Sequence, residues 1–183
     1  MKKIVFIVGS MRKESFNRQL ASTAETMLSD KFSIKYLDFE DIPLMNQDLE
    51  ANVPASVRRV REEILAADGI WIFTPEYNYS YPGLLKNLLD WLSRPMDISD
   101  FANPSAVVDK KVTVSGAGGK NQTASCRAKL NELLEFMRMQ VMKEPQTGIA
   151  LGLEAWTKGE FSLTPEQMTQ LQDQAARFAE FIG

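Results

Sequence analysis

Short apolar segments alternate with amphipathic segments along almost the whole chain, and this alternation limits the folds open to it. The apolar segments have the length and the β-rich composition of buried strands, and the amphipathic segments repeat their apolar side chains at helical spacing. In chain order, the expected strands and helices alternate at residues 3–8, 17–28, 33–37, 55–67, 69–74, 83–92, 111–115, 123–137, 140–142 and 166–182. The sequence therefore predicts a parallel sheet with helices on both of its faces.

The expected topology follows from this order of elements. Right-handed crossovers leave few arrangements, and we expect a flavodoxin-like three-layer α/β/α sandwich with a five-stranded parallel sheet in the order 2-1-3-4-5. The 183 residues suit a single domain, which we place at residues 1–183. A capping box with proline at the first helical position, Thr164-Pro165-Glu166-Gln167, marks the start of the last helix.

Charge and composition exclude several classes of function. The formal net charge is −3 and no cluster of lysine and arginine offsets it, so we expect no nucleic-acid partner. No segment approaches the ~20 apolar residues of a membrane span, so we expect no membrane partner. Cys126 is the only cysteine, which excludes an intrachain disulfide and a multi-cysteine metal site and favours a cytoplasmic protein. Because the chain has no histidine, a bound cofactor must supply most of any chemistry.

A turn rich in proline and tyrosine follows the expected strand at 69–74, at the sheet edge where open α/β proteins bind ligands. Its sequence is Pro75-Glu76-Tyr77-Asn78-Tyr79-Ser80-Tyr81-Pro82-Gly83. The prolines, the glycine and the asparagine predict a stiff turn that exposes its backbone, and the tyrosines add aromatic walls. Such a turn is suited to a planar ligand.

The loop after the first strand predicts an anion site. Residues 9–18 lead directly into a helix, whose N-terminal amides and dipole favour a phosphate group. Ser10, Ser15 and Asn17 offer neutral hydrogen bonds, and Arg12 offers a guanidinium that can form bidentate hydrogen bonds with a phosphate. The alternative is that Ser15 only caps the helix and Arg12 is a solvated loop residue. The loop has neither a Walker A nor a G-x-G-x-x-G pattern, which disfavours a nucleoside triphosphate or a Rossmann-bound dinucleotide.

The fourth strand runs into Gly116-Ala117-Gly118-Gly119, where backbone amides can approach a ligand closely, although a flexible turn is the plainer interpretation. In the expected strand order, the three loops line one crevice. Together they describe a site for a phosphorylated, planar, heteroaromatic ligand, and FMN fits this description best.

Two motifs resemble those of the NAD(P)H-dependent FMN reductase family, which includes bacterial quinone, azo and chromate reductases. They are Gly9-Ser10-x-Arg12-x-x-Ser15-x-Asn17-Arg18 and Pro75-Glu76-Tyr77-Asn78-x-Ser80-x-Pro82-Gly83-x-Leu85-Lys86-Asn87-x-x-Asp90-Trp91. The resemblance covers nearly the whole chain. It implies an oxidoreductase with bound FMN, a nicotinamide cosubstrate (NADPH or NADH), and homodimers or homotetramers with the flavin near a subunit boundary.

The resemblance also assigns the cofactor-binding residues by groups. The phosphate would be held by Ser10, Arg12, Ser15, Phe16 and Asn17. The isoalloxazine would be lined by Pro75, Glu76, Tyr77 and Asn78, and its pyrimidine side contacted by Ser115, Gly116, Gly118 and Gly119. For Glu76, a purely structural role as a turn carboxylate is an equal alternative.

The implied reaction passes hydride from the nicotinamide through flavin N5 to a small electrophilic electron acceptor in a ping-pong sequence, so no catalytic side chain and no metal are expected. The acceptor stays open among a quinone, an azo compound, chromate and free flavin. A flavodoxin-type one-electron carrier is the alternative function. Residues 95–110, interpreted as a lid or an interface loop, and residues 148–159 have no assigned role, and part of the leucine stripe at 84–92 is expected to pack on a second subunit.

Overall fold

The computed structural model describes residues 1–100 and 103–183 and contains the expected parallel sheet. Its strands are β1 (Lys2–Val8), β2 (Phe32–Tyr36), β3 (Gly69–Phe73), β4 (Lys111–Gly118) and β5 (Gln140–Met142). They lie in the order β2-β1-β3-β4-β5 and all pair in parallel. The predicted strand order is confirmed.

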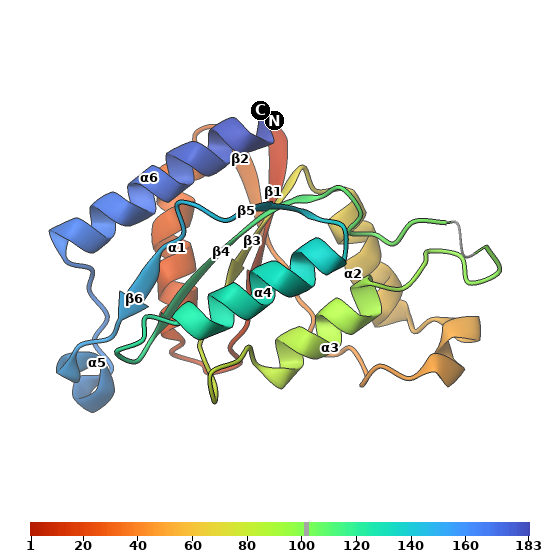
Figure 1. Cartoon of the computed structure of the whole chain (residues 1–183), viewed down its shortest axis with the longest axis horizontal. Coiled ribbons are helices and arrows are strands. Elements are labelled where there is room, and N and C mark those ends of the chain that lie inside the picture. The colour runs from red at the N-terminus through yellow and green to blue at the C-terminus, as the bar shows by residue number, and fades with distance from the viewer. Residues whose placement is uncertain (101–102) are drawn as a thin grey trace.

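Helices cover both faces of the sheet (Figure 1). The expected helices are present as α1 (Phe16–Leu28), α2 (Ala55–Leu65), α3 (Gly83–Leu92), α4 (Ala124–Phe136) and α6 (Pro165–Ile182). Helices α1 and α6 pack on one face, and α2, α3 and α4 pack on the other. The start of α6 has the predicted capping box, in which the Thr164 hydroxyl accepts from the Gln167 amide N–H and the Gln167 side chain accepts from the Thr164 N–H.

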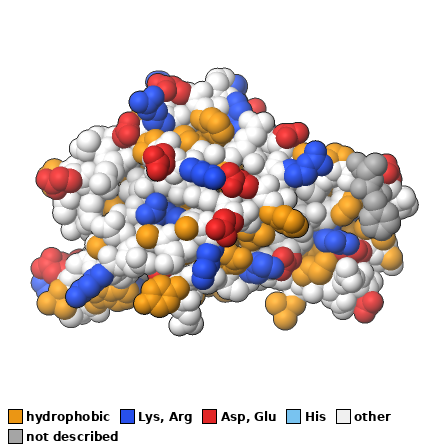
Figure 2. All heavy atoms as spheres, in the orientation of Figure 1, with side chains coloured by type: hydrophobic (Ala, Val, Ile, Leu, Met, Phe, Trp, Pro, Cys, Tyr) orange, Lys and Arg blue, Asp and Glu red, His pale blue; other side chains and the backbone are white. Residues whose placement is uncertain are grey.

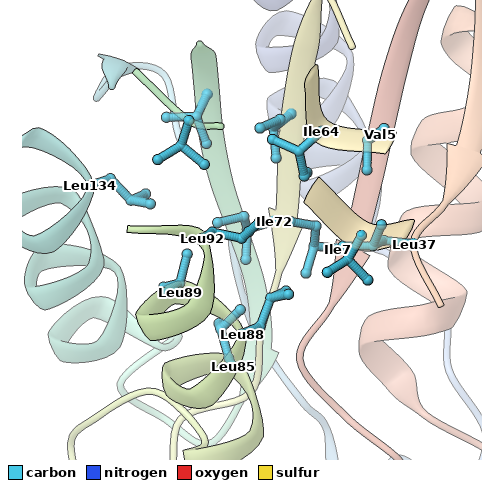
Figure 3. Close-up of a cluster of buried hydrophobic side chains, with 14 of the residues drawn as sticks. Val5, Ile7, Leu37, Ile64, Ile72, Leu85, Leu88, Leu89, Leu92 and Leu134 are labelled. Atoms are coloured by element: carbon cyan, nitrogen blue, oxygen red, sulfur yellow. The ribbon is translucent and has the colours of Figure 1, made fainter. Parts of the chain in front are cut away.

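The strands are apolar on both faces because each face has its own hydrophobic core. In β1, Val5 and Ile7 point into the core under α2, α3 and α4, whereas Ile4 and Phe6 belong to the core under α1 and α6. Figure 3 shows the first of these cores, where leucines of α3 meet Ile72 of β3. The alternation of side chains along a strand therefore explains the continuous apolar runs.

The five-stranded prediction is incomplete, because a sixth strand, β6 (Gly148–Ala150), pairs with the end of β4. Strand β4 runs on through the glycines: β5 pairs with its residues 111–113, and β6 pairs with its residues 116–118. A short helix, α5 (Leu153–Lys158), follows β6, and a 3-10 helix, η1 (Gln47–Asn52), precedes α2. Strand β6 is short and contains glycine and alanine, which are depleted in strands, so its sequence gives no strand signal.

Most of the leucine stripe of α3 lies inside the chain's own core, and the expected contact with a second subunit stays a prediction. Leu85, Leu88, Leu89 and Leu92 are all buried, and only Leu84 is partly exposed (Figure 3). These leucines pack on β1 and β3 and therefore do not support an oligomer.

The segment at 95–110 begins with an isolated antiparallel bridge between Pro95 and Ser105. Ala106 and Val107 are buried in the core under α3 and α4, which anchors the end of this segment. Its residues 101–102 lie outside the described part of the chain, and the interpretation as a lid or an interface loop stays a prediction.

The outer surface carries both signs of charge. Figure 2 shows lysine, arginine, aspartate and glutamate side chains interspersed over one face. Within residues 1–100 and 103–183, the helices lack the length and apolar character that crossing a membrane requires. The two termini lie together, and the Lys2 amino group donates to the carbonyl of Ile182 at 3.1 Å.

Candidate functional site

The carboxyl ends of β1, β3 and β4 meet at one cavity, as the strand order predicts. It is lined by Ser10, Arg12, Ser15, Phe16, Asn17, Pro75, Glu76, Tyr77, Ala117, Gly118, Gly119, Leu151 and Trp156. Its volume is about 130 Å³, well below the ~300–1,000 Å³ of pockets that enclose a ligand. A ligand held here therefore keeps much of its surface open.

The loop after β1 presents the N-terminus of α1 to this cavity. The Ser15 hydroxyl accepts from the Arg18 amide N–H at 3.3 Å, so Ser15 is the N-cap of α1, as the plainer interpretation proposed. That hydrogen bond uses the oxygen as acceptor and leaves the hydroxyl proton available to a ligand. The Arg12 guanidinium lies over the ring of Phe16 at 4.6 Å. Phe16 is buried, so its contribution is to support Arg12 from below.

Asn17 joins the phosphate loop to the glycine loop. Its side-chain amide donates to the Ala117 carbonyl at 3.0 Å, and its side-chain oxygen accepts from the Ala117 N–H at 2.8 Å. Asn17 is buried, and these two hydrogen bonds satisfy both ends of its side chain. Asn17 thus holds two walls of the cavity at a set separation.

The turn after β3 is a tight hairpin that projects its tyrosines outward. Tyr77 and Ser80 exchange backbone hydrogen bonds of 2.9 and 3.0 Å, and the two residues between them have positive φ, 52° for Asn78 and 59° for Tyr79. Positive φ at both central positions is the requirement of a type I′ turn. Lys129 donates to the Tyr79 carbonyl at 2.7 Å and anchors the tip. Tyr77 lines the cavity, whereas Asn78 does not.

Glu76 has a structural role that the structure makes explicit. One carboxylate oxygen accepts from the Cys126 backbone N–H at 2.8 Å, and the other accepts from the Asn121 side chain at 3.0 Å. Cys126 lies in the first turn of α4, and Thr123, the N-cap residue, makes no side-chain cap hydrogen bond. Glu76 therefore places its negative charge at the positive end of α4 and ties the turn after β3 to that helix.

The glycine loop is less open than the sequence suggests. Ser115 is fully buried, and its hydroxyl accepts from Trp71 at 2.9 Å and donates to Gln174 at 2.8 Å. Gly116 is enclosed as well, since its N–H donates to the Thr147 carbonyl at 3.0 Å and a Cβ there would lie under 3.0 Å from Thr123 Oγ1. Neither residue lines the cavity, whereas Gly118 and Gly119 do. Of the four residues predicted for the pyrimidine side, the structure brings only these last two to the site.

Three lining residues were missed by sequence reasoning: Ala117, which lies within the predicted glycine loop, Leu151 and Trp156. Leu151 follows β6, and its N–H donates to the Gly118 carbonyl at 2.8 Å. Trp156 of α5 is 60 % exposed, and its ring meets the edge of Phe16 at 6.3 Å between centroids. The only signal for Trp156 in the sequence was that an aromatic residue lies in the segment 148–159, which had no assigned role. Its position depends on the pairing of β6 with β4.

Cys126 lies close to the site but is buried away from it. Burial raises the pKa of its thiol to about 11, although a hydrogen bond with Thr74 acts in the opposite direction. At neutral pH the group is therefore a thiol, which is a weak nucleophile. Cys126 packs in the core under α3 and α4, where it serves as a small apolar residue.

The residues present at this cavity fit FMN. The exposed Arg12 and the N-terminus of the 13-residue helix α1 suit the phosphate. A Cβ at Gly119 would meet nothing within 4 Å, so a flat ligand has room beside the glycine loop. Tyr77 and Trp156 offer exposed aromatic surface on two sides of the same opening. The fold and the site thus define a flavodoxin-like, FMN-binding oxidoreductase.

Comparison with known proteins identifies the family. The family model described as NADPH-dependent FMN reductase matches residues 2–154. A quinone reductase of Pseudomonas putida is 33% identical over 181 residues, which cover 98% of this chain and 94% of that protein. The chain belongs to the NADPH-dependent FMN reductases. It is an oxidoreductase whose cofactors are FMN and NAD(P)H.

Solved structures agree with this assignment. FerB from Paracoccus denitrificans, a flavoenzyme NAD(P)H:(acceptor) oxidoreductase, superposes with a TM-score of 0.87 at 30% sequence identity, covering 100% of this chain and 97% of that one. A flavodoxin from the domain Archaea superposes with a TM-score of 0.61 at 14% identity, covering 100% of this chain and 99% of that one. The second comparison shows the shared fold alone, and it confirms the flavodoxin-like prediction.

Proposed function

We propose that the FMN-loaded protein oxidises NAD(P)H and reduces a small quinone in a ping-pong sequence. The observation that carries this proposal is the convergence of the phosphate loop, the tyrosine turn and the end of β4 on one cavity that encloses only part of a ligand. FMN held by these residues would supply the hydride-transfer chemistry. An open site of this kind lets the nicotinamide and the acceptor use the same position in turn.

The chain's own residues would bind FMN and orient its ring. Arg12, Ser10 and the first turn of α1 would hold the phosphate, and Pro75–Tyr77 and Gly118–Gly119 would border the ring. Tyr77 stands at the opening, where its exposed ring can flank a second planar molecule. No acid or base side chain is assigned. Hydride transfer between two stacked planar rings depends mainly on holding the rings close together in the right orientation.

The name of the Pseudomonas putida relative supports a quinone as acceptor. Azo compounds, chromate and free flavin are further acceptors to compare. We also propose a homodimer or homotetramer, on the resemblance to the family, and a cytoplasmic location, on the single cysteine.

The test is a set of steady-state assays on the purified, FMN-loaded protein. Rates of NADPH and NADH oxidation are measured with 1,4-benzoquinone, an azo dye, chromate and free FMN, and the initial-rate pattern is recorded at several concentrations of both substrates. We expect the highest kcat/KM with the quinone and parallel lines in a double-reciprocal plot. Intersecting lines would reject the ping-pong sequence. A protein that binds FMN but oxidises neither nucleotide would instead be a carrier of the flavodoxin type.

A further inference from the structure

A second cavity, of about 490 Å³, lies on the other side of the phosphate loop. It shares Ser10, Arg12 and Ser15 with the cavity described above, so the same loop forms a wall of both. Its remaining walls come from residues 36–40, at the end of β2 and just beyond it, and from Leu84 at the start of α3. Its volume lies within the ~300–1,000 Å³ of pockets that enclose a small ligand. None of the residues assigned to the FMN ring lines this space.

This second cavity gathers cations that have no carboxylate partner. Arg12, Lys13 and Arg18 line it, and none of the three forms an ion pair with another described residue. Arg59, by contrast, pairs with Asp41 at 2.6 Å. If Arg12 serves the FMN phosphate, Lys13 and Arg18 remain for a second anion. A phosphate monoester carries about −1.5 to −2 charges at neutral pH and suits two cations.

Arg18 is held in place by an aromatic ring. Its guanidinium lies over the ring of Tyr36 at 3.6 Å, and the Tyr36 hydroxyl in turn donates to Glu25 at 2.8 Å. Stacking leaves the N–H groups at the edge of the guanidinium free to donate in its plane. A cation oriented in this way, with a forked set of donors, is suited to a phosphate.

The carboxylates of the cavity do not cancel these cations. Asp38 is paired with Arg59 at 3.4 Å, and Glu40 is exposed at the rim. Leu84 and Met11 add apolar surface for a flat base, and Met11 is 58% exposed. The cavity therefore combines a phosphate-binding edge with an apolar wall, which is the chemistry of an adenosine phosphate.

We propose that this second cavity receives the adenosine end of NADPH, with Arg18 and Lys13 contacting its 2′-phosphate. The proposal rests on the function proposed above, in which the nicotinamide end of the same molecule faces the FMN ring. Because the phosphate loop forms a wall of both cavities, an extended dinucleotide can reach from the second cavity to the exposed face of an FMN ring held in the first. NADH lacks this 2′-phosphate, so the two cations in the cavity would favour NADPH over NADH.

The first test measures binding without turnover. The FMN-loaded protein is titrated calorimetrically with 2′,5′-ADP and, separately, with 5′-ADP, in the wild type and in Arg18→Gln and Lys13→Ala variants. We expect the wild type to bind 2′,5′-ADP at least about tenfold more tightly than 5′-ADP, and each variant to lose most of this difference. Equal affinity for the two nucleotides in the wild type would overturn the proposal, whether or not the protein turns over NAD(P)H.

The second test compares the two cosubstrates in the enzyme assay. We expect kcat/KM for NADPH to fall about tenfold relative to that for NADH in Arg18→Gln and in Lys13→Ala. Lys31→Ala, which removes an exposed cation beyond the other end of α1, is the matched control and should leave the ratio unchanged. Equal losses with both nucleotides, or a weakened FMN affinity in both variants, would assign the two cations to FMN and reject the inference. Normal NADH turnover with an unchanged ratio would reject it while the proposed function stands.

Discussion

The turn at Tyr77–Ser80 and the glycine loop at 116–119 both border the cavity, but they are stabilised in different ways. The turn closes on itself through two backbone hydrogen bonds between neighbours in the chain. The glycine loop is the end of a strand, held by Thr147, by Asn17 and by pairing with β6. One loop is built by local turn chemistry, and the other by contacts with distant segments.

This difference shows that glycines near a ligand need not be there for the ligand. At Gly116 the missing side chain makes room for Thr123 and for the Thr74 carbonyl, so the residue serves packing. At Gly119 no atom lies within 4 Å of a Cβ, so space is left open on the cavity side. The two glycines are three positions apart and have opposite surroundings.

The largest effect is expected from Gly116→Ala. The added methyl group would overlap two atoms at less than 3.0 Å, one of them a backbone oxygen that cannot rotate away. We expect the free energy of unfolding to fall by about 3 kcal/mol, measured by urea denaturation of the apoprotein. Gly119→Ala is the matched control, and its stability should stay within about 0.5 kcal/mol of the wild type. Equal losses in the two variants would remove the contrast between the two glycines.

A smaller loss is expected from Asn17→Ala, which breaks the link between the phosphate loop and the glycine loop. The buried N–H and carbonyl of Ala117 would lose their partners, at a cost of about 2 kcal/mol in unfolding free energy. The affinity for FMN, measured by flavin fluorescence, should fall as well because two walls of the site separate. Asn52→Ala, at an exposed asparagine of η1, should cost no more than about 0.5 kcal/mol. Unchanged FMN affinity in Asn17→Ala would show that the link serves stability alone.

Glu76→Gln tests whether the turn after β3 depends on the charge at α4. Glutamine keeps an acceptor for the Cys126 N–H but loses the negative charge at the helix N-terminus. We expect a loss of about 1 kcal/mol in unfolding free energy at low ionic strength, and a smaller loss in 1 M NaCl because salt screens the helix dipole. A loss of equal size at both salt concentrations would contradict the electrostatic explanation.

The smallest effect, a gain, is expected from Tyr79→Asn. Tyr79 has φ of 59° and is 69% exposed, so the substitution relieves backbone strain and gives up little packing. We expect the free energy of unfolding to rise by about 0.5 kcal/mol, measured by thermal denaturation. Tyr77→Asn, at a residue whose φ is not positive, should bring no such gain. A loss in Tyr79→Asn would mean that the exposed ring makes a stabilising contact.

The sequence alone determined the strand order, the five long helices and the loops that border the site. These features depend on side-chain periodicity and on residues that are adjacent in the chain, such as the capping box at Thr164 or the turn at Pro75–Gly83. The phosphate loop was also predictable, since a helix N-terminus after a buried strand is a local feature.

Only the tertiary structure decided which amides and side chains are free to meet a ligand. Asn17 and Ala117 are 100 positions apart, and β6 closes the end of β4 from a segment that carries no periodic pattern of its own. The same pairing brings Leu151 and Trp156 to the cavity, whereas Trp71 and Gln174 hold the Ser115 hydroxyl away from it. Contacts of this kind depend on the packed arrangement of distant segments, and the local pattern of a chain does not record them.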